Sequence, residues 1–565
     1  MTSSTTHRIS RDLAVSRRHM VAAKHPGAVG AALDVLDRGG NAVDAAVTAA
    51  FVVGVLEPWM SGIGGGGFMT IQRASGERAV VDYFSRAPRA AEPAMYRLTD
   101  GVRADGVGFG GVKDQANANG PLSIATPGMV AGLSIALERF GTRALAETLA
   151  PAIGFAEDGL PIEWYQSLLI ASQHRVIRSD PETARTFLVD GLLPAPSFDQ
   201  PPPKLKQPDL ARTLRRIAAD GAGAFYTGEI ADRIVGHVRL LGGILSADDL
   251  ADYQPVVLEP LVLPYRDVEV VLLPYQAGGP TTGEVLTILD GFDLQALGHN
   301  SAAALHLIAE ASRRASADRH AYIGDPDFVS IDWARLTSRE YCAGRRHEIS
   351  PGRASRPAPG AGIAHTPSAA AVAGGPVDEG CTTHLSVVDQ DGTMVSLTQT
   401  LTLLFGSGVT VPGTGVLLND SMNLFDPRPG LANSIAPRKR PASNMAHVIA
   451  VRDGRPFLAV GAPGGRRILD TCLQMAIDTI DYALDIQSAC AAPLIDCSGP
   501  ELLIDDRLPR STRDTLRAWG HAVAPVTVSY WPRHFASPTG VMVDLASGLR
   551  LGGADPFGIG IAAGR

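Results

Sequence analysis

The chain has 565 residues, of which 45% are hydrophobic and 19% are charged, an ordinary balance for a soluble globular protein. Its formal net charge of −8 gives no reason to expect nucleic acid or an acidic membrane surface as a partner. The apolar stretches at 45–56 and 123–137 are too short or too interrupted to span a membrane. The five cysteines show no CxxC spacing, and their odd number argues against a disulfide framework.

Residues 1–24 are polar and lack the apolar core of a signal peptide, so we expect a cytoplasmic protein. Apolar residues recur with helical spacing at 27–36, 42–56, 128–140, 210–219 and 302–320. Strand-like runs occur at 68–72, 79–84, 268–273, 447–451 and 457–460, and a hairpin is expected at 384–401. Helices dominate before residue 382 and strands cluster after it, a division that predicts an α+β fold.

The run Gly-Ile-Gly-Gly-Gly-Gly at 62–67 formally matches the dinucleotide pattern G-x-G-x-x-G, with Asp82 twenty residues after Gly62. In a true fingerprint a strand precedes the glycines and a helix follows them. Here a predicted helix precedes and a predicted strand follows, so the pattern does not support nucleotide binding. His384 and His447 read as isolated, and no His, Asp and Glu residues have metal-site spacing. We therefore expect neither a metal nor a cofactor.

Residues 351–377 are mostly Pro, Gly, Ala and Ser, a composition that predicts a flexible linker over 351–380. The sequence then changes abruptly into a strand-like run that begins at Cys381, Thr382 and Thr383. Cleavage between Cys381 and Thr382 would free an α-amine with a pKa near ~8 beside the Thr382 hydroxyl, for which it can act as the base. The pattern therefore indicates a self-cleaving enzyme, although a Thr pair that opens a strand after a linker is also a common structural feature.

The turn of the predicted hairpin is Gln390-Asp391-Gly392. If it is a three-residue loop, Asp389 pairs with Thr393 and Thr400 lies opposite Thr382. A two-residue loop would instead turn Thr400 to the other face of the sheet.

Two consecutive glycines, Gly464 and Gly465, lie between the predicted strand 457–460 and a helical pattern that continues to Ile480. Free backbone N–H groups at the start of a helix suit an oxyanion hole, where one donor contributes about 3 kcal/mol to transition-state stabilisation. A turn that only requires positive φ explains the same pair.

Taken together, these motifs resemble the γ-glutamyltransferase (γ-glutamyltranspeptidase) family of N-terminal-nucleophile (Ntn) hydrolases. The similarity extends over nearly the whole chain, through blocks at 27–29, 38–46, 61–68, 127–132, 324–328, 382–384, 405–408, 440–443 and 463–465. It implies a four-layer αββα sandwich that two autoprocessed subunits form jointly. The large subunit would be residues 1–381 and the small catalytic subunit residues 382–565, associated as a heterodimer.

Position by position, the resemblance implies that Thr382 is the nucleophile, released by cleavage after Cys381, and that Thr400 supports it. Gly464 and Gly465 match the oxyanion pair of the family. The catalytic residues of the family are therefore all matched in this chain.

The γ-glutamyl pocket departs from the family. Phe84 stands where the family binds the substrate α-carboxylate with an Arg, and Arg86 lies two residues on, on the same face if this segment is a strand. Leu424 replaces the Asp that pairs with the substrate ammonium. The other pocket positions are Thr402 and Ser421, in place of Asn and Gln, and Ser443 and Asn444, in place of two serines.

Without that Arg and Asp, an amino-acid head group loses two charge-assisted contacts of about 1.5–3 kcal/mol each, or roughly a hundredfold or more in affinity. The segment 426–439 is also short and lacks the lid Tyr of the family.

We expect an amidohydrolase or acyltransferase acting on a small-molecule amide. The acyl group of this substrate is either a γ-glutamyl group that is bound in an altered way or a different acyl group, such as a short dicarboxylic or oxalyl-type acyl. Arg466, directly after the glycines, either anchors a substrate carboxylate or points into solvent. The alternative is a catalytically silent, unprocessed member that acts as a binding or structural module.

Overall fold

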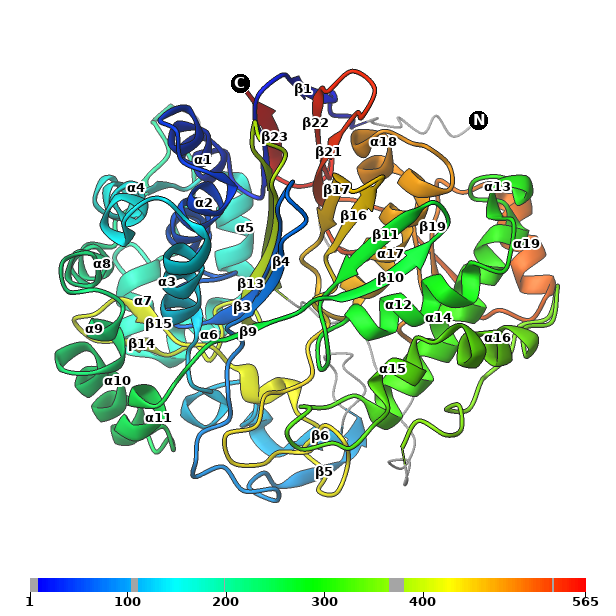
Figure 1. The fold of residues 1–565 in the computed structure, drawn as a ribbon. Helices are drawn as coiled ribbons and strands as arrows, with labels where there is room; N and C mark the ends of the chain where they lie inside the picture. The colour runs from blue at the N-terminus through cyan, green and yellow to red at the C-terminus, as the bar shows by residue number, and fades with distance from the viewer. Residues whose placement is uncertain (1–8, 103–109, 198, 365–380, 531–532) are drawn as a thin grey trace.

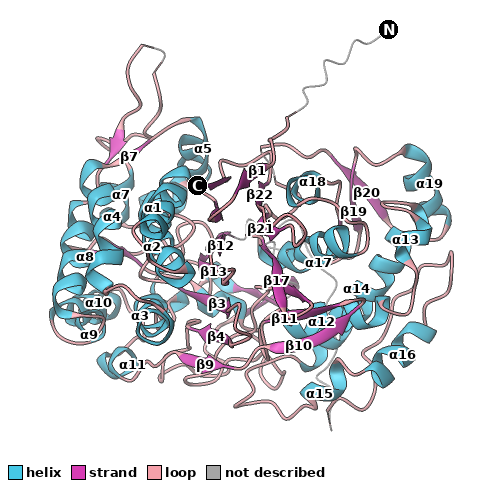
Figure 2. Cartoon of the chain, turned by 45° about the horizontal axis from the view of Figure 1, so that its top comes forward, coloured by secondary structure: helices cyan, strands magenta, loops and turns pink. Residues whose placement is uncertain are grey.

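The computed structural model describes residues 9–102, 110–197, 199–364, 381–530 and 533–565. Two seven-stranded antiparallel sheets lie at its centre, between two groups of helices (Figure 1, Figure 2). The order in the first sheet is β1 (Ala14–Ser16), β22 (Arg550–Ala554), β21 (Thr539–Val543), β17 (Arg455–Gly461), β16 (Val448–Arg452), β11 (Val268–Leu272) and β10 (Leu261–Tyr265). The order in the second sheet is β23 (Ile561–Gly564), β2 (Met20–Ala23), β12 (Cys381–Val388), β13 (Met394–Thr402), β3 (Gly66–Gln72), β4 (Arg78–Asp82) and β9 (Val256–Leu258).

Each sheet combines strands from before and after residue 381, so the expectation that strands cluster after residue 382 is wrong in part. The short strands β1, β2 and β9 each have only three or four residues, too few for a periodic pattern. The segments 1–381 and 382–565 therefore share both sheets, because strands of one segment are hydrogen-bonded to strands of the other in each sheet.

The helices form the two outer layers. The second sheet is covered by α1 (Pro26–Asp37), α2 (Ala42–Leu56), α3 (Met129–Phe140), α4 (Leu145–Asp158) and α8 (Pro208–Asp220) in one apolar cluster. The first sheet packs against α12 (Gly279–Leu289), α14 (Ala302–Tyr322) and α17 (Ile468–Ile480) in another. A third cluster that includes Met20, Val271, Met394 and Ile449 fills the space between the sheets. The layer order is therefore helix, sheet, sheet, helix.

The remaining elements surround this sandwich. The helices are α5 (Trp164–Ser172), α6 (His174–Ser179), α7 (Pro181–Phe187), α9 (Gly223–Tyr226), α10 (Glu229–Leu240), α11 (Ala247–Ala251), α13 (Leu294–Leu297), α15 (Trp333–Leu336), α16 (Arg339–His347), α18 (Ile486–Ala491) and α19 (Arg510–Ala518). The small sheets pair β5 (Leu98–Val102) with β6 (Gly110–Val112), β7 (Leu160–Pro161) with β8 (Lys204–Leu205), β14 (Thr410–Val411) with β15 (Val416–Leu417), and β18 (Ile495–Asp496) with β19 (Leu502–Asp505) and β20 (Val523–Val526). Short 3₁₀ turns lie at Lys113–Gln115, Pro121–Ser123, Ser421–Leu424 and Gly465–Arg467.

The first half of the expected linker has fixed contacts, which corrects that expectation for residues 351–364. The Tyr322 hydroxyl donates to the Gly360 carbonyl oxygen, Arg345 donates to that of Ala358, and Ile363 is buried. Composition missed this because the partners belong to α14 and α16 and not to the segment itself. The second half, 365–380, lies outside the described residues.

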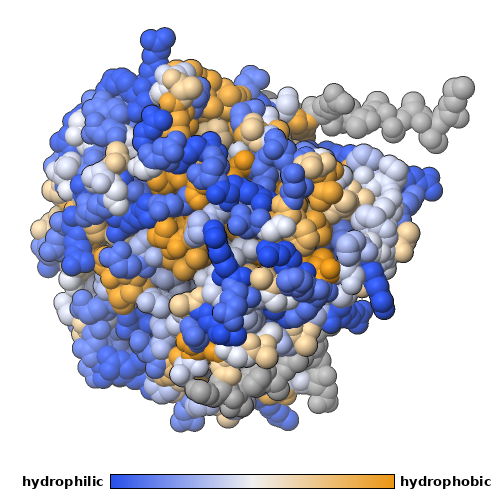
Figure 3. Space-filling view, turned by 45° about the vertical axis from the view of Figure 1, so that its right-hand side comes forward, coloured by the Kyte–Doolittle hydropathy of each residue, from blue (hydrophilic) through white to orange (hydrophobic). Residues whose placement is uncertain are grey.

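Figure 3 shows one face of the molecule, on which hydrophilic side chains separate several apolar patches. Within the described part of the chain, no helix combines the length and apolar character that crossing a membrane requires. The cytoplasmic location stays a prediction.

Candidate active site

The hairpin β12–β13 has the three-residue loop, one of the two alternatives that the sequence left open, and the register that this loop implies. The Asp389 amide donates to the Thr393 carbonyl oxygen over 3.2 Å, and the strands stay in that register up to Thr383. The register then shifts, so that Cys381 pairs with Thr402 and a bulge falls at Thr382. A bulge re-aims a side chain at the end of a ladder, and here it does so at the expected nucleophile.

Two hydroxyl groups meet at the carbonyl oxygen of Cys381. Thr382 Oγ1 lies 2.7 Å from this oxygen and donates to Thr400 Oγ1 over 3.2 Å. The Thr400 hydroxyl donates to the same carbonyl oxygen and accepts a hydrogen bond of 2.8 Å from the Thr402 amide. Thr400 therefore polarises the peptide carbonyl that Thr382 would attack, and the expected proximity of the two threonines is confirmed.

The glycine run 62–67 serves the close approach of strands. A Cβ on Gly65 would lie 2.2 Å from the Thr400 carbonyl oxygen, and one on Gly67 would lie 2.3 Å from that of Thr398. Asp82, the supposed ribose ligand, is buried and accepts hydrogen bonds from the Phe84 amide and Gln276. The helix α2 precedes the run and β3 follows it, so this region has the wrong order for a dinucleotide site.

Gly464 and Gly465 form the turn between β17 and α17. Their φ angles of 148° and 59° are positive, and a Cβ on Gly464 would lie 2.6 Å from Ala536 Cα. Within the described residues, neither glycine amide donates a hydrogen bond. The turn thus needs glycine for its conformation and also presents two donors, so the oxyanion role stays a prediction.

His384 is not isolated, which corrects the sequence-based interpretation. Its Nδ1 lies 2.8 Å from Thr398 Oγ1, which lies 3.0 Å from His447 Nδ1 on the segment leading into β16. Burial lowers the pKa of both histidines, that of His447 to about 3, so both rings are neutral. The His384 ring also packs on Gly461, where a Cβ would lie 2.3 Å away. His384 therefore connects the nucleophile strand to the strand that leads into the glycine turn.

The apolar replacements of the γ-glutamyl pocket lie in one cluster. Phe84 is 1% exposed and stacks on Phe68 with ring centroids 5.2 Å apart, and Leu424 packs against the same cluster. Phe84 is therefore a core residue in this structure. The two positions that the resemblance assigns to the charged head group therefore carry hydrocarbon side chains.

Arg86 lies beyond the end of β4, which is at Asp82. The condition for a shared face of Phe84 and Arg86, that this segment is a strand, is therefore not met. The Arg86 guanidinium donates to the Gln254 carbonyl oxygen over 3.1 Å and lies above the Tyr253 ring. These contacts direct its charge toward the segment before β9. Arg466 is partly exposed, and its guanidinium lies beside Gly499.

The other pocket positions make hydrogen bonds within the protein. Thr402 Oγ1 lies 3.0 Å from Ser421 Oγ. Arg319 of α14 donates to the Ser443 carbonyl oxygen over 2.7 Å and to Asn444 Oδ1 over 3.1 Å. Burial lowers the pKa of Arg319 to about 10. Sequence reasoning missed Arg319 because its acceptors lie more than a hundred residues away, although the predicted helix 302–320 contained it.

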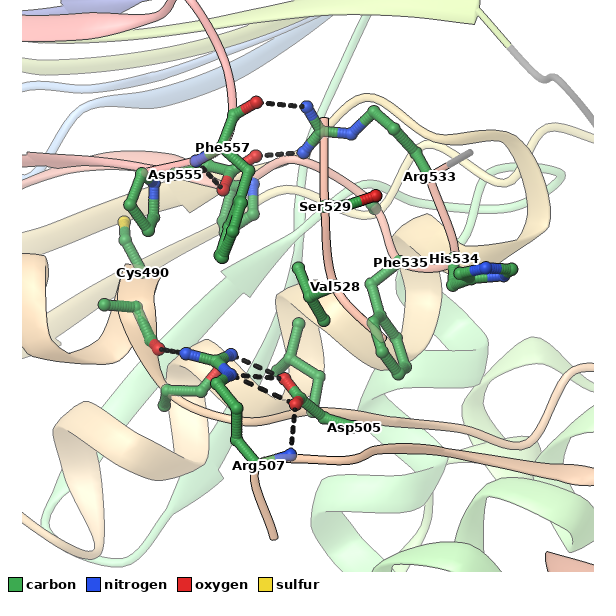
Figure 4. A pocket seen from close by; sticks show the side chains of 16 residues that line it. Cys490, Asp505, Arg507, Val528, Ser529, Arg533, His534, Phe535, Asp555 and Phe557 are labelled. Carbon is green, nitrogen blue, oxygen red and sulfur yellow. Dashed lines mark hydrogen bonds and ion pairs between the residues drawn. The ribbon is translucent and has the colours of Figure 1, made fainter. Parts of the chain in front are cut away.

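A pocket borders the glycine turn through Ala536, which contacts Gly464 (Figure 4). Two arginines line it, and both are neutralised. Arg507 forms a bidentate pair with Asp505, and Arg533 binds Asp555.

One cluster with possible metal ligands occurs among the described residues, formed by His306, Glu310 and His521. Its nitrogen atoms are already engaged. His306 Nδ1 lies 2.8 Å from His521 Nε2, His306 Nε2 contacts the Ser350 carbonyl oxygen, and His521 Nδ1 lies 3.3 Å from Arg313 Nη1. A guanidinium at this place disfavours a cation, so the cluster is a buried hydrogen-bond chain. The spacing of His306 and His521, 215 residues apart, hid the cluster from sequence analysis.

The hydroxyl pair and the four-layer sandwich define an enzyme of the Ntn class, which hydrolyses or transfers amides. The chain matches the model of the gamma-glutamyltranspeptidase family over residues 28–564, and it belongs to that family. It is 38% identical to the acylase ACY 1 proenzyme of Pseudomonas sp. strain V22, over 90% of this chain and 88% of that protein. It is 34% identical to the glutathione hydrolase proenzyme of Escherichia coli K12, over 90% and 86%. The crystal structure of cephalosporin acylase from Bacillus halodurans matches with a TM-score of 0.86 and 28% identity, over 100% of this chain and 99% of that chain.

Proposed function

We propose that this chain cleaves itself between Cys381 and Thr382 and then uses Thr382 to transfer or hydrolyse a small acyl group from an amide. The observation that carries the proposal is the pair of hydroxyls, from Thr382 and Thr400, at the Cys381 carbonyl oxygen. The products 1–381 and 382–565 would remain a heterodimer because they share both sheets.

Self-cleavage begins when Thr382 Oγ attacks the carbonyl carbon of Cys381. The new O–C bond replaces the C–N bond, and the hydroxyl proton passes to the Thr382 nitrogen. Water then hydrolyses the ester, which releases the Cys381 carboxyl group and restores the hydroxyl. The hydrogen bond from Thr400 stabilises the negative charge on the Cys381 oxygen during the attack.

In turnover the freed α-amine of Thr382 takes the hydroxyl proton, because its pKa near ~8 suits a base at neutral pH. The hydroxyl oxygen attacks the amide carbon of the substrate, and the amides of Gly464 and Gly465 bind the resulting oxyanion. The amine leaves with a proton. Water or a second amine then removes the acyl group from Thr382.

For the acyl group we propose a short dicarboxylic or oxalyl-type acyl in preference to γ-glutamyl. Phe84 and Leu424 fill the head-group position with apolar side chains. Arg466 is a partly exposed cation one residue after the glycine turn, where it can attract the distal carboxylate of such an acyl group. The similarity to proteins that are named acylases supports the same class.

The test compares two anilide substrates, glutaryl and γ-glutamyl, which differ only in the α-amino group. We expect kcat/KM to be about tenfold higher or more for the glutaryl substrate. The reason is that Leu424 offers no carboxylate to bind the ammonium group of a γ-glutamyl substrate. A preference for γ-glutamyl would contradict the proposed acyl class. No turnover of either amide or of an oxalyl anilide, in a chain that stays uncut, would favour the silent member instead.

A further inference from the structure

The carboxylate of Glu57 approaches the nucleophile strand from the helical layer. Glu57 follows α2, is 1% exposed, and its Oε2 accepts a hydrogen bond of 3.4 Å from the Thr383 hydroxyl. Its other oxygen, Oε1, is buried without a partner among the described residues. Thr383 is the residue after Thr382, at the edge of the bulge. Neither the cleavage nor the turnover described above uses this buried carboxyl group.

The turn after α2 holds both strands of the active hairpin. The Met60 amide donates to the Glu57 carbonyl oxygen over 2.8 Å, and the Met60 carbonyl oxygen accepts from the Leu401 amide over 3.1 Å. Leu401 follows Thr400, so one turn contacts β13 beside Thr400 and, through Glu57, β12 beside Thr382. The helix α2 is a firm support for this turn, since all of its 15 residues are buried and its first turn has a capping box.

The charges around Glu57 come from several elements and balance one another. Lys24, after β2, is buried and donates to Ser537 Oγ, which donates to Asp555 over 2.6 Å. Arg533 binds the same Asp555 (Figure 4). The electrostatic surroundings are completed by the hydroxyl of Tyr165 from α5 and the thiol of Cys381.

Two of these groups titrate close to neutral pH. Burial raises the pKa of Glu57 to about 7, against the opposing effect of Lys24. Burial likewise lowers the pKa of Lys24 to about 8. The charge of Glu57 therefore changes in this pH range, in contact with Thr383, the residue after Thr382.

We propose that Glu57 is a positioning residue for self-cleavage, which holds the Thr383 hydroxyl and through it fixes the bulge that aims Thr382 at the Cys381 carbonyl. This inference rests on the proposed function. A simpler role is that Glu57 only balances the buried charge of Lys24. The two roles differ in Thr383, whose hydroxyl matters only if Glu57 acts through it.

The experiment follows cleavage of newly made chains in timed cell-free synthesis by intact-mass spectrometry. Glu57→Gln and Thr383→Val should each slow cleavage about tenfold or more, as loss of a hydrogen bond to a charged group predicts. Thr383→Ser, which keeps the hydroxyl, should cleave at close to the wild-type rate. The double variant should be no slower than the slower single variant, because both changes remove one contact. Glu284→Gln, at a buried carboxyl group of α12, is the matched control and should leave the rate unchanged.

The pH profile separates positioning from stability. Between pH 5.5 and 9 the self-cleavage rate of the wild type should show an inflection near pH 7 that Glu57→Gln lacks. The melting temperature of every variant is measured alongside. A Thr383→Val chain that cleaves at the wild-type rate would overturn the inference, even if Glu57→Gln does not fold. A wild-type chain that is never cut would instead refute the proposed function itself.

Discussion

Among single residues, Thr400 has the contacts of a catalytic group in its own right. It accepts from Thr382 and from the Thr402 amide, and it donates to the Cys381 carbonyl oxygen. Thr402 has a φ of 96°, a conformation that costs a non-glycine residue about 1–3 kcal/mol. The backbone at the end of β13 is therefore strained where it supports the Thr400 hydroxyl.

Replacing Thr400 by Val should slow self-cleavage about a hundredfold, because it removes the donor that stabilises the Cys381 oxyanion. Val keeps the shape of Thr, so the fold and melting temperature should change little. Timed mass spectrometry gives the rate, and Thr400→Ser is the control that should stay within about tenfold of the wild type. Unchanged cleavage in Thr400→Val would show that this hydroxyl has no part in the step.

At the scale of elements, the contact between the His384 ring and Gly461 sets the distance between β12 and β17. Gly461→Ala would place a Cβ 2.3 Å from the His384 ring, and such overpacking costs about 1–3 kcal/mol. We expect a lower melting temperature and a lower kcat with KM nearly unchanged, since β17 carries the glycine turn. The control is Gly236→Ala in α10, where a Cβ meets no atom within 4 Å. Equal kcat in both variants would contradict this coupling.

The elements that sequence analysis predicted well are those with local signals. The helix α2 has the expected bounds because Asn41 and Asp44 form a capping box at its start. The turn residues of β12–β13 located the hairpin but left two registers open, and the structure has the one with a three-residue loop. The contacts of Glu57 and Arg319 could not be predicted, because the acceptor or donor lies 326 residues away in one case and 124 in the other. The end of β4 at Asp82 was missed because Tyr83 and Phe84 continue the apolar, strand-like pattern, and Tyr83 still exchanges backbone hydrogen bonds with Gly67.

For the whole molecule, buried neutral histidines predict acid sensitivity. The pKa of His447 is lowered to about 3 and that of His521 to about 4, chiefly by burial. An unfolded chain with ordinary values near 6.5 binds more protons below that pH, so stability is lost as the pH falls from 6.5 toward these values. Each group contributes up to about 1.4 kcal/mol per pH unit.

Denaturant unfolding between pH 7 and pH 4.5 should therefore show a falling free energy of unfolding. In His447→Gln the fall should be smaller by up to about 1.4 kcal/mol per pH unit below 6.5, because one titrating group is gone. Parallel curves for the two proteins would mean that His447 is not held neutral by the fold.

The most direct test of the account is the intact mass of the purified wild-type protein beside its Thr382→Ala and Thr382→Ser variants. We predict two wild-type fragments, one ending at Cys381 and the other beginning at Thr382, which elute together in size-exclusion chromatography. Thr382→Ser should also be cut, because it keeps a hydroxyl, and Thr382→Ala should remain one inactive chain. A single uncut wild-type chain, or cutting of Thr382→Ala at the same bond, would contradict the claim that Thr382 releases itself as the nucleophile.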